Sequence, residues 1–264
     1  MKQKKKHLSN LTITDNQELI PGFFRIKATD RNALLPDMQP GQFAELKVSG
    51  NEASFLRIPI GIHFVDRETN EVWFLIHAVG DGTRQLAALR KNDHLDAILP
   101  LGRGFSLPDT PGRQVLLIGG GVGVAPLLFQ GEVLKENGHT PIFLMGARSQ
   151  SELLQVREFQ AIGEVYTTTD DGSEGEKGYV TQHSLLDKPQ AHFDLIQTCG
   201  PRSMMEAVAR YARHTGTECE VSLENTMGCG IGVCLCCVEN TIKGHLRVCK
   251  DGPVFNMNDL LWQI

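Results

Sequence analysis

The sequence has no apolar run long enough to cross a membrane as a helix. Such a span needs about 20 consecutive apolar residues, and polar or charged residues interrupt every shorter hydrophobic stretch of the 264-residue chain. The basic residues at its start are not followed by the apolar core of a secretory signal. We therefore expect a cytoplasmic protein that has neither a membrane-spanning segment nor a removable leader.

An excess of positive charge is also lacking. Asp and Glu (31) outnumber Lys and Arg (26), which gives a net charge of −5 and a pI near 6.0. Nucleic acids and anionic membranes attract strongly basic surfaces, so neither is an expected partner. Repeats and low-complexity tracts are absent as well, and a hydrophobic content of 41% suffices for the cores of two compact domains.

Cysteine is missing from the first 198 residues and concentrated in the rest. The seven cysteines are Cys199, Cys219, Cys229, Cys234, Cys236, Cys237 and Cys249, and the last five fall within 21 residues. Because the number is odd and a secretory signal is absent, a disulfide framework is the weaker interpretation. The clustering indicates a metal centre.

Changes in residue pattern divide the chain into three parts, which are residues 1–110, 111–218 and 219–264. The first part contains short segments rich in β-branched and aromatic residues, separated by turns, at residues 42–48, 72–77 and 94–99. This pattern predicts an antiparallel β-barrel or sandwich.

The second part alternates strands and helices. Strands are expected at residues 115–118, 141–145 and 193–197, and helices at residues 126–137, 151–162 and 201–215. Such alternation predicts a parallel α/β sheet with a ligand crevice at the carboxyl ends of its strands. The middle of the chain is therefore predicted to bind a nucleotide.

A glycine loop is the first candidate contact of this nucleotide. The sequence Gly119-Gly-Gly-Val-Gly-Val-Ala-Pro126 follows an apolar strand and opens a helix. Backbone amides in such a position can receive a diphosphate, and the candidates are Gly119, Gly120, Gly121 and Gly123. Pro126 replaces the third glycine of the dinucleotide fingerprint, and no acidic residue follows about 20 positions later, so a merely tight turn is the alternative.

The second candidate contact is the sharp break at Cys199-Gly200-Pro201, where a strand gives way to a helix. It would face the same crevice and suit a nicotinamide ring. A helix start with a buried cysteine explains the pattern equally well.

The cysteine run Cys229-Gly-Ile-Gly-Val-Cys234-Leu-Cys-Cys237 has the spacing C-x4-C-x2-C, and Cys249 follows after eleven residues. This is the spacing of plant-type [2Fe–2S] proteins, in which four thiolates hold two irons. A zinc site with the same four cysteines is the alternative, although zinc modules usually pair their ligands in two separated knuckles. Cys236 is expected to be a spare thiol and Cys219 a small buried side chain.

With its β-rich first part, glycine loop, Cys-Gly-Pro turn and C-terminal cysteine run, the sequence resembles ferredoxin–NADP reductase-like proteins that carry a C-terminal cluster. More narrowly, it is similar to the electron-transfer subunits of NAD-dependent, two-subunit dihydroorotate dehydrogenases. The resemblance extends from Leu11 to Phe255. Its most specific parts are Ser222-Leu-Glu-Asn225 before the cysteine loop and Asp251-Gly-Pro-Val-Phe255 after it.

The resemblance implies a barrel that binds FAD, a middle domain that binds NAD(H), and a [2Fe–2S] cluster. Electrons from a dihydroorotate-oxidising partner subunit that holds FMN would reach NAD⁺ through the cluster and FAD, in a heterotetramer with two subunits of each kind. A flavin is required because nicotinamide exchanges hydrides, whereas the cluster takes single electrons. The implied flavin contacts are Arg57, Ile58, Pro59, Ile60, Gly61, Leu75, Ile76, His77, Gly82 and Thr83.

The chain departs from the family at its flavin motif. The family usually has Arg-Pro, then an aromatic or aliphatic residue, then Ser, whereas this chain reads Ile58-Pro-Ile-Gly61. The phosphate-binding arginine and the hydroxyl are therefore missing, and Arg57, one position earlier, points to the opposite face of a regular strand. We expect FAD to bind more weakly here than in typical relatives.

Other functions are compatible with the same patterns. The chain could be a flavin reductase subunit that serves another partner. It could also be a relative with a regulatory role and no catalytic turnover, or a non-catalytic zinc-binding adaptor. A general acid or base is not needed, so His63 and His77 are expected to be strand histidines with satisfied hydrogen bonds. Arg148 is expected to be a solvated loop residue rather than a contact of a ribose or 2′-phosphate, and the nucleotide is expected to be NAD(H).

Overall fold

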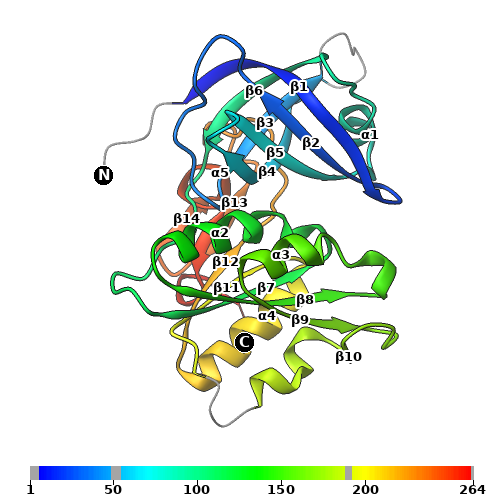
Figure 1. Ribbon diagram of the computed structural model, residues 1–264. Helices are drawn as coiled ribbons and strands as arrows, with labels where there is room; N and C mark the ends of the chain where they lie inside the picture. Colours follow the sequence, from blue (N-terminus) through cyan, green and yellow to red (C-terminus); the bar gives the residue numbers. More distant parts are fainter. Residues whose placement is uncertain (1–5, 49–54, 188–191, 263–264) are drawn as a thin grey trace.

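The computed structural model describes residues 6–48, 55–187 and 192–262, and Figure 1 shows their arrangement. A barrel lies at the top of Figure 1, and a sheet with helices on both faces lies below it. The C-terminal segment, coloured orange to red, packs beside both units. No helix among the described residues is long and apolar enough to cross a membrane.

The barrel is closed and antiparallel, with the strand order β1-β2-β5-β4-β3-β6. Its strands are β1 (His7–Ile20), β2 (Phe23–Thr29), β3 (Phe43–Val48), β4 (Ile58–Asp66), β5 (Glu71–His77) and β6 (His94–Leu101). Every second side chain fills the interior, as Ile26 and Ala28 of β2 and Phe74 and Ile76 of β5 illustrate. The predicted antiparallel barrel is confirmed.

The sheet below the barrel has seven strands in the order β10-β9-β8-β7-β11-β12-β15. The parallel strands are β7 (Gln114–Gly120), β8 (Thr140–Ala147), β9 (Glu164–Thr169), β10 (Glu176–Lys177), β11 (Leu195–Cys199) and β12 (Glu218–Ser222). Gly119 is paired with Cys199 of β11 and Met145 of β8, so the carboxyl ends of the three central strands are level. The predicted parallel α/β fold is confirmed.

Helices cover both faces of this sheet. The helices α2 (Ala125–Glu136) and α3 (Val156–Ile162) lie between the sheet and the barrel, and α4 (Arg202–Thr215) covers the opposite face (Figure 1). The buried residues of α4, Met205, Val208, Ala209 and Ala212, follow the i, i+3, i+4, i+7 spacing of an amphipathic helix.

The prediction of one helix over residues 151–162 is wrong in its first half. Residues Gln150–Glu152 form one 3₁₀ turn, and Gln155 adopts a left-handed conformation with φ of 52°. The chain turns inward between them and buries Leu154, which is 2% exposed in the core shared with Phe159. The continuous helix is interrupted because burial of this leucine requires the extended backbone found at Leu153.

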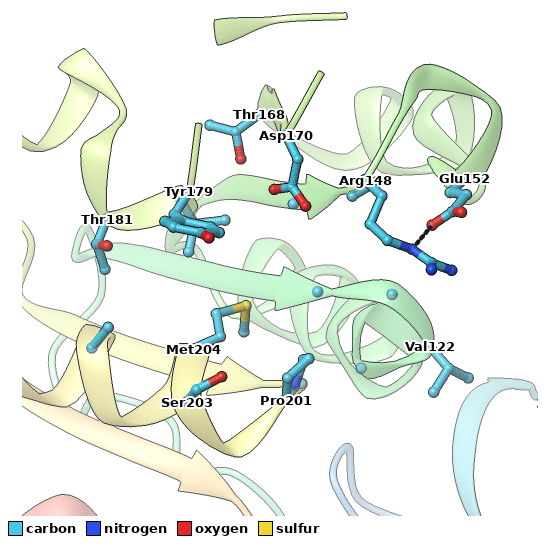
Figure 2. Close-up of a pocket in the computed structure, with 18 of the residues that line it drawn as sticks. Val122, Arg148, Glu152, Thr168, Asp170, Tyr179, Thr181, Pro201, Ser203 and Met204 are labelled. Atoms are coloured by element: carbon cyan, nitrogen blue, oxygen red, sulfur yellow. Dashed lines mark hydrogen bonds and ion pairs between the residues drawn. The ribbon is translucent and has the colours of Figure 1, made fainter. Parts of the chain in front are cut away.

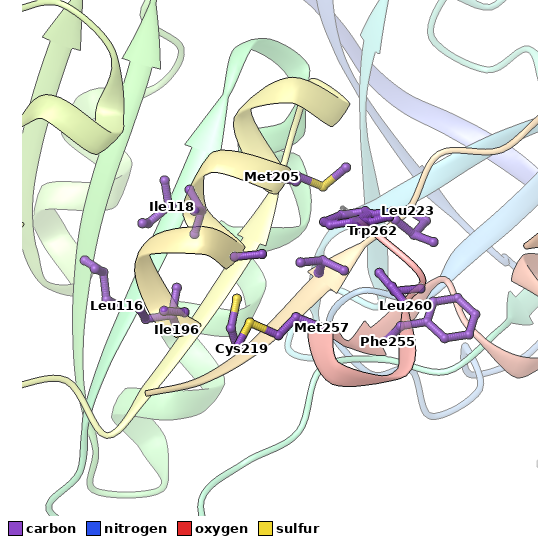
Figure 3. Packing of buried hydrophobic residues seen from close by; sticks show 14 of the residues in the cluster. Leu116, Ile118, Ile196, Met205, Cys219, Leu223, Phe255, Met257, Leu260 and Trp262 are labelled. Carbon is purple, nitrogen blue, oxygen red and sulfur yellow. The ribbon is translucent and has the colours of Figure 1, made fainter. Parts of the chain in front are cut away.

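The C-terminal segment shares its core with the sheet. It contains the hairpin β13 (Val238–Thr241) and β14 (Gly244–Arg247), the helix α5 (Val248–Asp251) and β15 (Val254–Asn256), which pairs antiparallel with β12. Figure 3 shows Met257 beside Cys219, while Phe255 and Leu260 extend the same hydrophobic cluster away from the sheet. Cys219 is fully buried and its pKa is raised to about 12 by burial, as expected of a small core side chain.

Candidate functional site

A crevice of about 780 Å³ runs along the carboxyl edge of the parallel strands (Figure 2). The glycine loop contributes Gly120, Gly121 and Gly123 to its wall, and the second predicted turn contributes Gly200 and Pro201. Its volume lies within the roughly 300–1,000 Å³ of ligand sites, and its position is where open α/β sheets bind nucleotides. The structure therefore brings the two predicted turns into one cavity.

The two turns are in direct contact. A Cβ atom on Gly123 would lie 2.5 Å from the carbonyl oxygen of Cys199 and 2.5 Å from the Cα of Gly200, so only glycine permits this approach. Gly119 lies behind the crevice wall, where it packs against Val124 and does not line the cavity.

Cys199 lies beneath the crevice surface rather than in it. The residue is 3% exposed, and burial followed by the nearby Glu224 carboxylate raises the pKa of its thiol. The thiol is therefore neutral at ordinary pH. Glu224 itself lines the crevice, and burial raises its pKa too.

Several lining residues were not identified from the sequence. They include Phe23, Asp170, Tyr179, Thr181, Ser203 and Glu224. Asp170 directly follows β9, a strand that the sequence patterns did not reveal. Once that strand is known, its carboxyl end points to Asp170 as a crevice residue.

The barrel closes one end of the crevice through a pair of stacked rings. His77, at the end of β5, stacks on Phe23 with ring centroids 4.0 Å apart and planes 8° apart, and both residues line the cavity. His77 is thus a crevice residue and not only a strand histidine. Its neighbours Leu75 and Ile76 are buried at 3% and 0% exposure, so only their backbone can meet a ligand at the barrel surface.

The flavin motif occupies the start of β4, next to the turn that opens the helix α1 (Asp81–Ala87). Arg57 donates hydrogen bonds to the Asp96 carboxylate at 2.7 Å and to the Asp96 carbonyl oxygen at 3.2 Å. This ion pair holds the guanidinium against β6. Arg57 therefore serves the barrel, and a flavin phosphate would compete with Asp96 for it.

The place of the missing arginine is filled by an apolar side chain. A Cβ atom on Gly82 would lie 2.6 Å from Cδ1 of Ile58, which shows that Ile58 packs directly on the turn. Thr83 closes that turn by hydrogen bonding with its hydroxyl to Gly80, whereas a Cβ on Gly61 would meet no atom within 4 Å. These residues fit a flavin whose phosphates meet backbone amides and the Thr83 turn, without an arginine.

We expect the substitution Ile58→Arg to strengthen FAD binding by about tenfold. A charged hydrogen bond to a phosphate contributes about 1.5–3 kcal/mol, and the lost packing of Ile58 on Gly82 offsets part of this gain. The measurement is the dissociation constant of FAD from flavin fluorescence during titration of the apoprotein. Ile58→Met, which has similar reach but no charge, is the matched control. Equal affinities for all three proteins would show that the phosphates are not bound at this position.

The four predicted cluster cysteines form two pairs of interacting thiols. The Cys229 sulfur accepts hydrogen bonds from the backbone amides of Val233 at 3.3 Å and Cys234 at 3.5 Å, and the Cys229 and Cys234 thiols interact. The Cys237 sulfur accepts a hydrogen bond from the Cys249 amide at 3.4 Å, and these two thiols also interact. No three His, Cys, Asp or Glu side chains in the described ranges are grouped so that they could hold one metal ion.

The electrostatic surroundings of the two pairs differ. Burial opposes ionisation of Cys229, but the backbone amides of Cys234, Ile231 and Val233 outweigh it and lower its pKa to about 6. Burial and the neighbouring Cys237 thiol raise the pKa of Cys249 to about 12. The first pair lies on a partly exposed loop, whereas Cys237 and Cys249 are 1% and 2% exposed within the core shared with α4.

The cysteine loop also rests on the barrel. Gly230 has a left-handed backbone with φ of 63°, and a Cβ there would lie 2.4 Å from Cγ of Glu45 on β3. Glu45 is 1% exposed, and burial raises its pKa to about 7 although Arg57 lowers it. The loop is thereby fixed between the barrel and the sheet. Four thiols, with backbone amides that donate hydrogen bonds to the sulfurs, are a donor set that fits an iron–sulfur cluster.

Comparisons with known proteins agree with this geometry. Residues 224–261 match the family model described as the iron-sulfur cluster binding domain of dihydroorotate dehydrogenase B, and residues 117–210 match the oxidoreductase NAD-binding domain. The chain is 37% identical over 262 residues to the dihydroorotate dehydrogenase B (NAD(+)) electron transfer subunit of Bacillus velezensis, covering 97% of this chain and 99% of that protein. The chain belongs to this family of electron transfer subunits.

Further relatives extend the comparison. The family member from Shouchella clausii is 38% identical over 228 residues, which cover 84% of this chain and 86% of that protein. A solved NADH-dependent reduced ferredoxin–NADP oxidoreductase superposes with a TM-score of 0.85 at 29% identity, covering 99% of this chain and 92% of that one. A ferredoxin NADP⁺ reductase from Neisseria gonorrhoeae, with a TM-score of 0.64 at 15% identity over 81% of this chain and 93% of that one, shares the fold. The resemblance predicted from the sequence is confirmed, and the family is one of oxidoreductases that carry electrons.

Proposed function

We propose that this chain carries electrons from a dihydroorotate-oxidising partner subunit that holds FMN, through a [2Fe–2S] cluster and FAD, to NAD⁺. Cys229, Cys234, Cys237 and Cys249 would hold the cluster, and the start of β4 and the turn before α1 would hold FAD. When bound, FAD supplies the change from single-electron to hydride transfer. Family membership and the match to the NAD-binding domain support this function.

One observation carries the proposal. Glu224 lines the nucleotide crevice, and Cys229, only five residues later, begins the cysteine loop. A single short segment thus joins the two redox sites, and Glu45 holds its far end against the barrel. Glu45 is paired with Pro59 of the flavin motif in the barrel. In this proposal the nucleotide, cluster and flavin sites therefore lie next to this one segment, and electron transfer between them requires such proximity.

The chain's own residues have distinct roles in this proposal. The glycine loop binds the nucleotide diphosphate, and Gly200 and Pro201 position the nicotinamide beside the barrel. The stacked rings of Phe23 and His77 bound the crevice on the barrel side and restrict access of water to the nicotinamide. The Cys199 thiol has no direct role in this proposal, because it lies beneath the crevice surface.

A partner subunit is supported by the surface around the cysteine loop. Ile231, Val233 and Leu235 are 39%, 74% and 60% exposed, and apolar side chains gathered on one loop are typical of a protein interface. We propose a cytoplasmic heterotetramer of two such chains and two catalytic subunits. Another flavin-dependent enzyme in place of the dihydroorotate-oxidising subunit would use the same loop.

The test is a visible spectrum with iron, zinc and flavin analysis of anaerobically purified protein, alone and co-expressed with an FMN-containing dihydroorotate-oxidising subunit. Two irons and one FAD per chain, with NAD⁺ reduction that depends on dihydroorotate in the complex, are expected. One zinc without colour would refute the redox function. Two irons and FAD without dihydroorotate-dependent activity would instead identify a reductase with a different partner.

A further inference from the structure

The chain passes from the barrel to the sheet through residues 102–113, a strap that joins β6 to β7 (Figure 1). Its first part is bound to the barrel, where the amide of Phe105 donates a hydrogen bond to the carbonyl oxygen of Pro40 at 2.9 Å. The next residue is bound to the sheet, because the amide of Ser106 donates to the carboxylate of Glu220 on β12 at 3.0 Å. Two consecutive residues, about 3.8 Å apart, are thus attached to different units of the molecule.

The carbonyl oxygen of Ser106 is held by two further side chains. It accepts hydrogen bonds from the side-chain amides of Gln130 on α2 at 3.0 Å and Gln197 on β11 at 2.9 Å. Gln130 also donates to Gln197 at 2.8 Å, and Gln197 donates to Glu220 at 2.7 Å. Gln130, Gln197 and Glu220 therefore form one hydrogen-bonded clamp that binds both backbone polar groups of Ser106.

The clamp is built on the elements that carry the two turns of the nucleotide crevice. Gln197 precedes Cys199 by two residues on β11, so both side chains lie on the same face of the sheet. It is paired in register with Glu220 on the neighbouring strand. Gln130 belongs to α2, the helix that the glycine loop opens. A shift of the strap against the clamp would therefore move the barrel relative to both turns.

Packing leaves room for such a shift. A cavity of about 520 Å³ lies between the barrel and α2, and it is bordered by Pro40, Phe105 and Gln130. Close packing resists displacement in protein interiors, but it is incomplete on this side of the molecule. The hydrogen bonds of the clamp therefore have the larger part in holding the barrel in place here.

Stability alone does not account for the clamp. Gln130 and Gln197 are both 0% exposed, and their hydrogen bonds must offset the cost of removing two amides from water. The Oε1 atom of Gln130 makes no hydrogen bond to any residue that the structure describes. Two apolar side chains of similar size would fill the same space without this cost. The glutamines add direction, because a hydrogen-bonded network in a core holds one arrangement of its members.

We propose that Gln130, Gln197 and Glu220 are positioning residues that fix the barrel against the sheet and so set the spacing between flavin and nicotinamide. The barrel contributes Phe23 and His77 to the crevice, whereas the sheet contributes both turns. A displacement of about 1 Å between reacting groups can lower a rate by about a hundredfold. This inference rests on the proposed function, since it assumes that a flavin on the barrel meets a nicotinamide in the crevice.

The first test replaces Gln130 and Gln197 together by methionine in the full-length protein loaded with FAD. Methionine is similar in size and cannot donate a hydrogen bond, and Ser106 is exposed, so water can satisfy its backbone and the unfolding free energy should change little. Single-turnover oxidation of NADH, followed by stopped-flow flavin absorbance, should slow by at least about tenfold. The dissociation constant of NAD⁺ should stay within about twofold, because the residues that line the crevice are unchanged. An unaltered rate in this double variant would overturn the proposal.

Hydrogen exchange at the Ser106 amide tests the clamp without any cofactor. Glu220→Leu removes the acceptor of this amide and should speed its exchange by at least about tenfold. Glu220→Gln keeps an acceptor oxygen in the same place, so it should retain both slow exchange and the wild-type rate of NADH oxidation. This pair of variants also decides the question if the double methionine variant does not fold. Slow exchange in Glu220→Leu would show that other contacts hold the strap, and the proposal would fail.

Gln114→Met is the matched control. Gln114 is the exposed first residue of β7, at the far end of the strap, and its replacement makes the same chemical change outside the clamp. Exchange and NADH oxidation should equal those of the wild-type protein. A slower reaction in this control as well would assign the effect to the substitution itself and remove the support for the clamp.

The outcomes separate this inference from the proposed function. Wild-type protein that transfers hydride from NADH to its flavin, with equal rates in the double methionine and Glu220→Leu variants, would overturn the positioning role and leave the proposed function intact. Wild-type protein that binds FAD but does not oxidise NADH would overturn the proposed function, and with it the effect of the clamp on flavin and nicotinamide.

Discussion

Replacement of Cys237 by serine should remove the iron–sulfur cluster altogether. Cys237 is 1% exposed and pairs with Cys249 in the core. A serine hydroxyl at position 237 would leave one iron without its fourth thiolate, and solvent cannot reach the buried position to replace it. The purified variant should contain no cluster iron and lack the visible bands of the cluster. Dihydroorotate-dependent NAD⁺ reduction in the complex should fall by more than about a hundredfold. This loss is larger than that expected from removing a residue that only hydrogen-bonds to a metal ligand.

Two comparisons make this result specific. Cys236→Ser should keep full iron content, since Cys236 is exposed and its neighbour Cys237 has the required spacing. NADH oxidation by Cys237→Ser with an artificial acceptor that takes electrons from the flavin should persist, because the crevice and barrel are untouched. Retention of the cluster in Cys237→Ser with its loss in Cys236→Ser would show that the ligand is the neighbouring cysteine.

Acid should destabilise the fold through His63. This residue of β4 is fully buried, and its Nδ1 donates to the carbonyl oxygen of Ala125 at 2.6 Å, at the start of α2. Burial lowers its pKa from 6.5 to about 4, while the hydrogen bond to Ala125 and the nearby Gln155 side chain oppose the shift. The expected satisfied hydrogen bond of this strand histidine is the one at Nδ1, whereas Nε2 makes no hydrogen bond to any residue that the structure describes.

The direction of the effect follows from proton binding. Between pH 6.5 and pH 4 the unfolded chain binds a proton at His63 that the folded chain does not, so the free energy of unfolding falls as the pH is lowered. The full loss below pH 4 is on the order of 3 kcal/mol. Above pH 6.5 both states are neutral at this residue and the contribution is constant.

The measurement compares the wild-type protein with His63→Asn in urea unfolding across this pH range. Asparagine can still donate to the Ala125 carbonyl but cannot titrate, so its unfolding free energy should fall less steeply toward pH 4. Trp73, whose ring centroid is 6.5 Å from that of His63, reports the transition by fluorescence. Glu45 contributes a slope of the opposite sign, because its raised pKa favours the folded state at low pH. This contribution is the same in both proteins and cancels when their unfolding free energies are subtracted. If the unfolding free energies of the two proteins changed equally with pH, His63 would be excluded as the source of acid sensitivity.

The large features of the fold could be predicted from local patterns. Short segments rich in β-branched and aromatic residues marked the barrel strands, and the repeated change from strand to helix marked the parallel sheet. The helix at 151–162 was predicted too long because burial of Leu154 interrupts it, which depends on packing against Phe159. The strand β9 was missed although its Glu164–Thr169 sequence is rich in β-branched and aromatic residues, because Val165 is its one aliphatic residue, and its place in the sheet is fixed by pairing with β8.

The sequence by itself determined the chemistry of the sites. The spacing of the four cysteines, the glycine loop and the Cys199-Gly200-Pro201 turn are short-range features, because the residues of each lie within at most 21 positions of one another. The replacement of the family's arginine by Ile58 was equally visible. Such signals need no knowledge of the fold because the residues that cooperate are neighbours in the chain.

Only the tertiary structure decided how these sites meet and which charges surround them. Asp170 stands 49 positions after Gly121 and reaches the same crevice because β9, β8 and β7 are adjacent in the sheet. Arg57 is held by Asp96, 39 residues away, and Gly230 rests on Glu45 of the barrel. These contacts arise from strand pairing and core burial between distant segments, and no local pattern encodes them.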